Sequence, residues 1–153
     1  VEALKQERTD NTDGMDVCLV CMENNGKPEK DIYFAGAKRP LFYYKPGEGE
    51  IKKIKGDRYS IGGINKNKKE KEFNTQKLTL EKGDIMYLTT DGIFDQVNAN
   101  SKRFSTRRFL TIMQDNITMP LEIQGNVLEE ELLYFKGESE QRDDITVLGA
   151  KII

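Results

Sequence analysis

The 153 residues include 24 basic and 26 acidic side chains, two cysteines and no histidine. The near balance of charge gives no strong field that would attract nucleic acid or membrane, and no apolar run approaches the roughly 18 residues of a transmembrane helix. The lack of histidine excludes Ser-His-Asp and Cys-His catalysis. We therefore expect a soluble cytoplasmic protein of one domain, without nucleic-acid or membrane contact, whose chemistry comes from carboxylates, metal ions or backbone.

The two cysteines occur in the sequence Cys-Leu-Val-Cys at positions 18 to 21. A structural zinc site needs four ligands, and residues three apart in a strand point to opposite faces. The sequence thus favours two buried, reduced thiols over a zinc site.

The amino-terminal half reads as a succession of strands. Residues 1–8 are typical of the end of a helix, and the apolar run 15–22 predicts a strand covered on both faces. Further short strands separated by Gly and Pro turns are predicted at 32–35, 41–44 and 51–54. This rhythm indicates an antiparallel sheet. Residues 65–72 contain no apolar side chain and predict a solvated loop or hairpin tip, the alternative being a phosphate-binding patch.

The carboxy-terminal half continues with strands around Leu78–Leu80 and at 85–90, and then changes character. Ser105 and Pro120 each precede apolar residues at helical spacing, the second set being Ile123, Val127, Leu128 and Leu132. Residues 145–153 close the chain as an apolar strand. Helices grouped after strands predict an α+β fold with mainly antiparallel sheet.

Acidic residues stand next to two of the predicted strands. Asp91 follows the apolar strand 85–90 and precedes Gly92, which allows a sharp turn, while Asp143 and Asp144 stand just before the last strand. If the two strands are antiparallel neighbours, Asp91 and Asp143 converge. Two close carboxylates repel unless a cation lies between them, and oxygen ligands select Mg²⁺, Mn²⁺ or Ca²⁺.

A simpler interpretation stays open for the same residues. Aspartate is common beside strands because its side chain bonds nearby backbone amides in turns. Four other aspartates fit that role better and are predicted to be turn or surface residues: Asp16, Asp57, Asp84 and Asp95, the last a potential neighbour of the metal site.

Five segments, in order, resemble the SpoIIE-type phosphatases, relatives of protein phosphatase 2C (the PPM family). They are Asp13-Gly14-Met15-Asp16-Val17-Cys18-Leu19, Tyr33-Phe34-Ala35-Gly36-Ala37 with Pro40-Leu41, Leu80-Glu81-Lys82-Gly83-Asp84, Leu88-Thr89-Thr90-Asp91-Gly92-Ile93-Phe94-Asp95 and Arg142-Asp143-Asp144-Ile145-Thr146-Val147.

The resemblance implies an α-β-β-α sandwich and metal-dependent hydrolysis of phosphoserine or phosphothreonine by a water that two Mn²⁺ or Mg²⁺ ions activate. It implies that Asp91 and Asp143 are metal ligands, that Asp144 shapes the turn, and that Gly92 belongs to the metal-binding Asp-Gly element. No further catalytic residue is implied. The implied partner is a phosphoprotein, with anti-sigma-factor antagonists as the expected class.

The sequence also departs from the family pattern. The family's Gly-Asp-x-x-Asp and Asp-x-Ser-Gly-x-Gly segments belong before residue 1, Ala37 stands where many relatives carry histidine or asparagine, and residues 59–63 only approximate a Leu-Gly pattern. We therefore expect 1–153 to be a single partial domain, incomplete at its N-terminus and inactive alone, that pairs with a second copy through exposed sheet edges.

Two other functions remain open. One is a non-catalytic regulatory or protein-binding module that kept the fold and lost the metals. The other, a nucleotide- or nucleic-acid-binding domain, is disfavoured because no Gly-rich phosphate loop precedes a helix.

Overall fold

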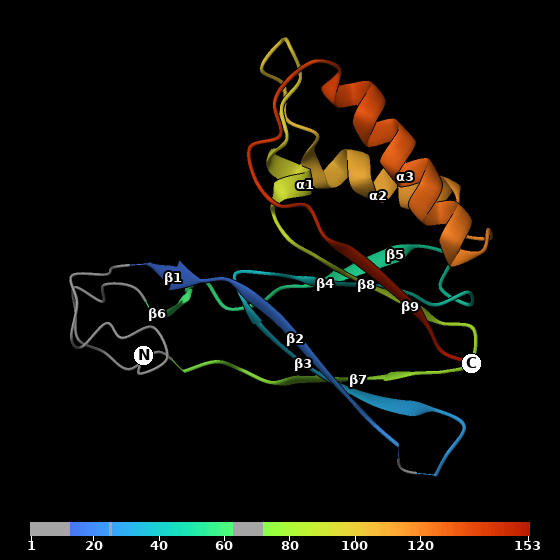
Figure 1. The fold of residues 1–153 in the computed structure, drawn as a ribbon. Helices are drawn as coiled ribbons and strands as arrows, with labels where there is room; N and C mark the ends of the chain where they lie inside the picture. The colour runs from blue at the N-terminus through green and yellow to red at the C-terminus, as the bar shows by residue number, and fades with distance from the viewer. Residues whose placement is uncertain (1–12, 25, 63–71) are drawn as a thin grey trace. The chain divides into compact units, whose positions relative to one another are not determined.

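The computed structural model describes residues 13–24, 26–62 and 72–153 (Figure 1). The chain divides into two units, one made of Val1–Leu41 with Lys53–Lys82 and the other of Phe42–Lys52 with Gly83–Ile153. The helix end predicted at residues 1–8 lies outside the described residues, as does all of the predicted loop 65–72 except residue 72.

The first unit is built on a three-stranded sheet in the order β2-β3-β7. Its strands are β2 (Val17–Glu23), β3 (Lys30–Ala37) and β7 (Gln76–Leu80), and both pairings are antiparallel. Ile32 and Phe34 are fully buried, as expected of alternate positions on one face of a central strand. A two-stranded antiparallel ladder joins β1 (Gly14–Met15) to β6 (Ile61–Gly62).

The prediction that the run 15–22 is covered on both faces was wrong. Leu19 and Met22 of β2 are 61% and 54% exposed. They lie three positions apart, so they point to opposite faces of the strand. The physical reason is that β2 is an outer strand, so its side chains have same-face neighbours from β3 only, whereas the central β3 has them from β2 and β7.

The burial of the two cysteines also differs from the prediction. Cys21 is exposed and Cys18 is half-buried, so the prediction of two buried thiols was wrong for Cys21. The Cys18 thiol donates to the Pro40 carbonyl at 3.6 Å, and burial raises the pKa of Cys18 to about 11. A thiol with so high a pKa carries little thiolate, the form that binds metal.

The second unit holds most of a four-stranded sheet in the order β5-β4-β8-β9. The strands are β4 (Leu41–Tyr44), β5 (Ile51–Ile54), β8 (Ile85–Thr89) and β9 (Val147–Lys151), and the helices are α1 (Gly92–Asp95), α2 (Ser105–Asp115) and α3 (Leu121–Lys136). Helices α2 and α3 pack on one face of this sheet (Figure 1). The centre of the contact is aromatic, since the Phe109 ring lies 5.5 Å from Phe42 and 6.4 Å from Tyr87.

Helix α3 begins directly after Pro120, as predicted, but its buried face differs from the expected one. Ile123 is 43% exposed, whereas the neighbouring Gln124 is 1% exposed. The Gln124 amide donates to the Ile117 and Met119 carbonyls, and its oxygen accepts the Tyr87 hydroxyl at 2.6 Å. Because these bonds satisfy its polar atoms, a glutamine can take the core position that apolar spacing assigned to Ile123.

The predicted α+β fold with antiparallel sheets is confirmed, with three helices in the described part of the chain. The sequence did not predict the one-turn helix α1, which directly follows Asp91. None of the helices among the described residues combines the length and apolarity that crossing a bilayer requires.

Candidate metal centre

Strands β8 and β9 are antiparallel neighbours, as the convergence of the acidic residues requires. Their register pairs Ile85 with Lys151 and Thr89 with Val147. The carboxyl end of β8 therefore lies beside the start of β9. Asp91 comes two residues after this ladder and Asp143 four residues before it, so both belong to the same edge of the strand pair.

Thr90 extends the contact beyond the ladder through three strong hydrogen bonds. Its backbone N–H donates to the Thr146 carbonyl at 3.0 Å. Its hydroxyl accepts the Thr146 N–H at 2.9 Å and donates to the Asp144 carbonyl at 3.0 Å. The Thr90 hydroxyl thus forms the hydrogen bonds that a backbone group would form in a continued ladder. These bonds hold residues 144–146 against the segment that contains Asp91.

Gly92 allows the two segments to approach more closely than any other residue would. A Cβ at position 92 would lie 2.4 Å from the Asp144 carbonyl oxygen and 3.1 Å from a side-chain carbon of Ile145. Gly92 is buried at the start of α1, with helical backbone. The glycine is therefore required by space, which gives the Asp-Gly element seen in the sequence a physical meaning.

Each predicted ligand occupies a turn next to this contact. The Asp91 carbonyl accepts the Phe94 and Asp95 amides at 2.8 and 3.0 Å, and its side chain makes no capping bond to α1. Asp143 is exposed, and its Oδ1 accepts the Asp144 N–H at 2.8 Å. The turn-forming role that was the simpler interpretation is thus present at Asp143 itself.

Two glutamines, which the sequence did not single out, tie the loop before β9 in place. Gln96, only 1% exposed, donates from Nε2 to the Glu140 carbonyl at 3.0 Å and so links the end of α1 to this loop. Gln141 donates to the Asp143 carbonyl at 2.9 Å. The Gln96 bond has no signal in the sequence, because only the fold brings Glu140 near. The Gln141 bond is local and depends on the irregular backbone of this loop.

Asp91 and Asp143 carry carboxylate oxygens, the kind of ligand that hard divalent cations select. Mn²⁺ and Mg²⁺ prefer about six oxygen ligands, several of which can be water. In residues 13–24, 26–62 and 72–153, no three Asp, Glu, Cys or His side chains gather in an arrangement that could hold a metal ion. The described residues therefore do not form a complete metal site by themselves, and the ligand role of Asp91 and Asp143 stays a prediction.

The four aspartates assigned to turns or surface differ in their surroundings. Asp95 is exposed and pairs with Arg103 at 3.0 Å, and Asp57 accepts both the backbone and the side-chain N–H of Asn74. Asp84, however, is 4% exposed, so its surface assignment was wrong. Asp84 directly precedes β8, where the end of the chain returns beside it, and its carbonyl accepts the Ile152 N–H at 2.9 Å.

Asp16 is a structural ion-pair residue in the first unit. It lies 2.9 Å from Arg39 and 3.4 Å from Lys38, and it accepts the Ser60 hydroxyl. Burial raises the pKa of this carboxyl, but the hydrogen bonds from Ser60 and Arg39 outweigh burial and leave the pKa below its usual value.

Comparison with solved structures gives the class of protein. The SiaA-PP2C domain of Pseudomonas aeruginosa has a TM-score of 0.80 and 30% identity, and the match covers 98% of this chain and 56% of that domain. The phosphatase domain of SpoIIE from Bacillus subtilis (Mn presoaked) has a TM-score of 0.62 and 18% identity, and the match covers 99% of this chain and 62% of that one. The catalytic domain of the serine/threonine phosphatase PstP, in complex with two manganese ions, has a TM-score of 0.60 and 18% identity, and the match covers 99% of this chain and 64% of that one. The latter two establish likeness of fold.

The chain thus has the fold of PP2C-type phosphatase domains. It matches the family model described as Stage II sporulation protein E (SpoIIE) over residues 1–153, and it belongs to that family. No curated protein matches the chain significantly. The chain spans between 56% and 64% of the length of the three solved structures named above.

We predict that Gly92→Ala destabilises the chain by about 2 kcal/mol, the usual cost of forcing an atom into a packed site. Without the clash, alanine would stabilise a helix, so the sign of the change is informative. Chemical denaturation followed by circular dichroism measures it. Gly47→Ala is the control, because a Cβ at position 47 meets no atom within 4 Å. Equal stability of Gly92→Ala and Gly47→Ala would contradict the close approach of Gly92 to Asp144.

Proposed function

We propose that this chain forms part of a metal-dependent phosphatase domain that hydrolyses phosphoserine or phosphothreonine in a protein substrate. The observation that carries the proposal is the contact between the Asp91-Gly92 turn and the Asp143-Asp144 turn, made in a member of the SpoIIE family. The manganese in the PstP complex supports the choice of a hard divalent cation.

In this proposal Asp91 and Asp143 each donate a carboxylate oxygen to Mn²⁺ or Mg²⁺. A pair of such ions, when bound, would lower the pKa of a water so that its deprotonated form could attack phosphorus in line near neutral pH. Thr90 and Gly92 set the spacing of the two acidic turns. The Asp144 carbonyl is the acceptor that anchors its own turn to Thr90.

The 153 residues alone are proposed to be inactive, and the activity belongs to the parent protein. Two carboxylates leave most of the shells of two ions to other donors. The coverage of the solved phosphatase domains supports this, since the chain matches only part of each. The family match runs through both structural units, which supports one partial domain rather than two domains.

The proposed substrate is a cytoplasmic phosphoprotein. Phosphorylated anti-sigma-factor antagonists are the class that resemblance to the family suggests. The site itself does not discriminate among phosphoproteins, because the acidic turns would hold the metal rather than the peptide.

A non-catalytic regulatory or protein-binding module is the second candidate. It is favoured by one observation, that no three potential ligands gather among the described residues. The sequence preceding Val1 in the parent gene separates the two candidates, because only an enzyme requires further acidic ligands there.

We predict that Asp91→Asn in the parent protein lowers hydrolysis of a phosphoserine peptide by more than about 100-fold, because loss of even an outer-shell partner of a metal costs about 10- to 100-fold. The measurement is steady-state phosphate release with Mn²⁺ present. Asp95→Asn is the matched control, since it removes an exposed carboxylate four residues away, and its activity should stay within about threefold of wild type. Robust hydrolysis by Asp91→Asn would contradict the metal-ligand role of Asp91, whereas robust hydrolysis by residues 1–153 alone would contradict only the proposal that these residues are inactive by themselves.

We also infer that the chain self-associates through outer strands. Leu19 and Met22 on β2, and Leu148 on β9, are more than half exposed, and both strands stand at the edge of their sheets. Exposed apolar edges favour pairing with another chain.

Light scattering of residues 1–153 is predicted to show a mass above that of the monomer, rising with concentration. Leu19→Lys should lower that mass, because a charged side chain opposes strand pairing. Tyr134→Lys is the control, since Tyr134 is 85% exposed but lies on α3. A clean monomer at high concentration, or equal effects of the two variants, would contradict pairing through β2.

A further inference from the structure

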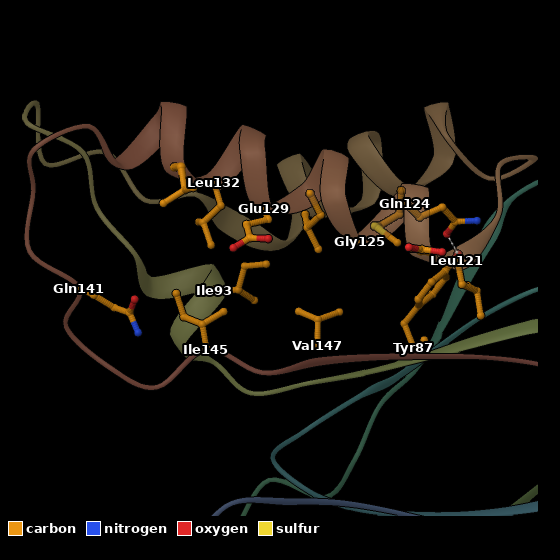
Figure 2. A pocket seen from close by; sticks show the side chains of 15 residues that line it. Tyr87, Ile93, Leu121, Gln124, Gly125, Glu129, Leu132, Gln141, Ile145 and Val147 are labelled. Carbon is orange, nitrogen blue, oxygen red and sulfur yellow. Dashed lines mark hydrogen bonds between the residues drawn. The ribbon is translucent and has the colours of Figure 1, made fainter.

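The second unit contains a cavity of about 610 Å³ beneath α3 (Figure 2). Its walls come from helices α1, α2 and α3, from strands β8 and β9, and from the segment that precedes β9. This volume lies within the range of about 300–1,000 Å³ that is usual for small-molecule sites. The cavity is large enough for a ligand with a substantial apolar body.

Most of the residues that line the cavity have apolar or aromatic side chains. Leu128 and Leu132 contribute from α3, Ile93 from α1, and Ile145 and Val147 from β9 and the segment before it. Burying an apolar ligand against such side chains is favourable at about 25 cal/mol per Å² of apolar surface.

The deep polar groups are already satisfied by one another. Tyr87 and Gln124 both line the cavity, and the Tyr87 hydroxyl donates to the Gln124 oxygen at 2.6 Å. Both amide protons of Gln124 are used by backbone carbonyls. The Tyr87 and Gln124 side chains therefore need no hydrogen bond from a ligand at this end of the cavity.

The charged side chains that line the cavity are all negative. Glu122 and Glu129 both line it from α3, and no lysine or arginine stands among its described lining residues. Figure 2 shows the Glu129 carboxylate directed from α3 toward the space beside Ile93. Glu122 and Glu129 are both solvent-exposed, so their carboxylates lie at the mouth of the cavity. An occupant with a cationic group at the mouth would complement them.

Gly125 leaves the wall open between the two glutamates. It lies in the interior of α3, where glycine is less favourable than alanine, and a Cβ there would meet no atom within 4 Å. Neither tight packing nor a positive φ requires this glycine. A larger side chain at position 125 would occupy space that is now part of the cavity.

We propose that this cavity binds a small amphiphilic cation, with its apolar body against Ile93, Leu128, Leu132 and Val147 and its ammonium group beside Glu129. The lining residues include neither Asp91 nor Asp143, so the inference does not rest on the proposed phosphatase function.

Octylammonium, octanoate and 1-octanol are the probes that test the charge preference, because they share one alkyl chain. Calorimetric titration of the parent protein should show octylammonium binding about tenfold more tightly than octanoate, with 1-octanol between them. Glu129→Gln should weaken octylammonium binding by about three- to fivefold, the value of one exposed ion pair. Glu130→Gln is the matched control, since Glu130 is an exposed neighbour on α3 that does not line the cavity.

The position of the site is tested separately at Gly125. Gly125→Leu should weaken octylammonium binding at least tenfold by filling the cavity, whereas Gly125→Ala should retain it and raise the melting temperature. If Gly125→Leu does not fold, the comparison of Glu129→Gln with Glu130→Gln decides. Failure of all three probes to bind, equal binding of the three, equal effects of the two glutamine variants, or unchanged binding by folded Gly125→Leu would each overturn the proposal.

Discussion

The hydrogen bonds of Thr90 with Thr146 and Asp144, together with the approach of Gly92 to the Asp144 carbonyl, fix where the acidic residues of this chain lie. The β8–β9 ladder alone ends at Thr89 and Val147, short of every predicted ligand. The hydrogen bonds of Thr90 extend the pairing of the two strands beyond the ladder. Because glycine has no Cβ, the turn at Gly92 can contact the turn at Asp144. The candidate metal centre is therefore a consequence of backbone contact.

The sequence predicted the two acidic turns because each has a local signal. An Asp-Gly pair after an apolar strand and an Asp-Asp pair before one are visible without any knowledge of pairing. Their proximity required only that β8 and β9 be antiparallel neighbours, which the structure confirms. The supporting roles of Gln96 and Gln141 could not be predicted in the same way. Each bonds a carbonyl on a loop of irregular backbone, and periodicity gives no information about such loops.

The errors in the fold prediction share a cause. Apolar runs indicate a strand or helix but do not say how much of it other segments cover. The run 15–22 does contain β2, yet β2 is an outer strand, and Leu19 and Met22 are exposed. On α3, Gln124 replaces Ile123 in the core because its hydrogen bonds with Tyr87, Ile117 and Met119 compensate for burial. Local composition predicted the elements, whereas burial depended on tertiary partners.

The central claim is that the turns at Asp91 and Asp143 hold one divalent cation together. Paramagnetic broadening by Mn²⁺ tests it most directly, because it detects weak binding and reports position residue by residue. Adding Mn²⁺ to the ¹⁵N-labelled parent protein should broaden the amides of residues 91–93 and 143–145 in parallel, at the same metal concentration, and Asp91→Asn should abolish both effects. Broadening of one segment without the other, or of neither, would contradict a shared metal site at this edge.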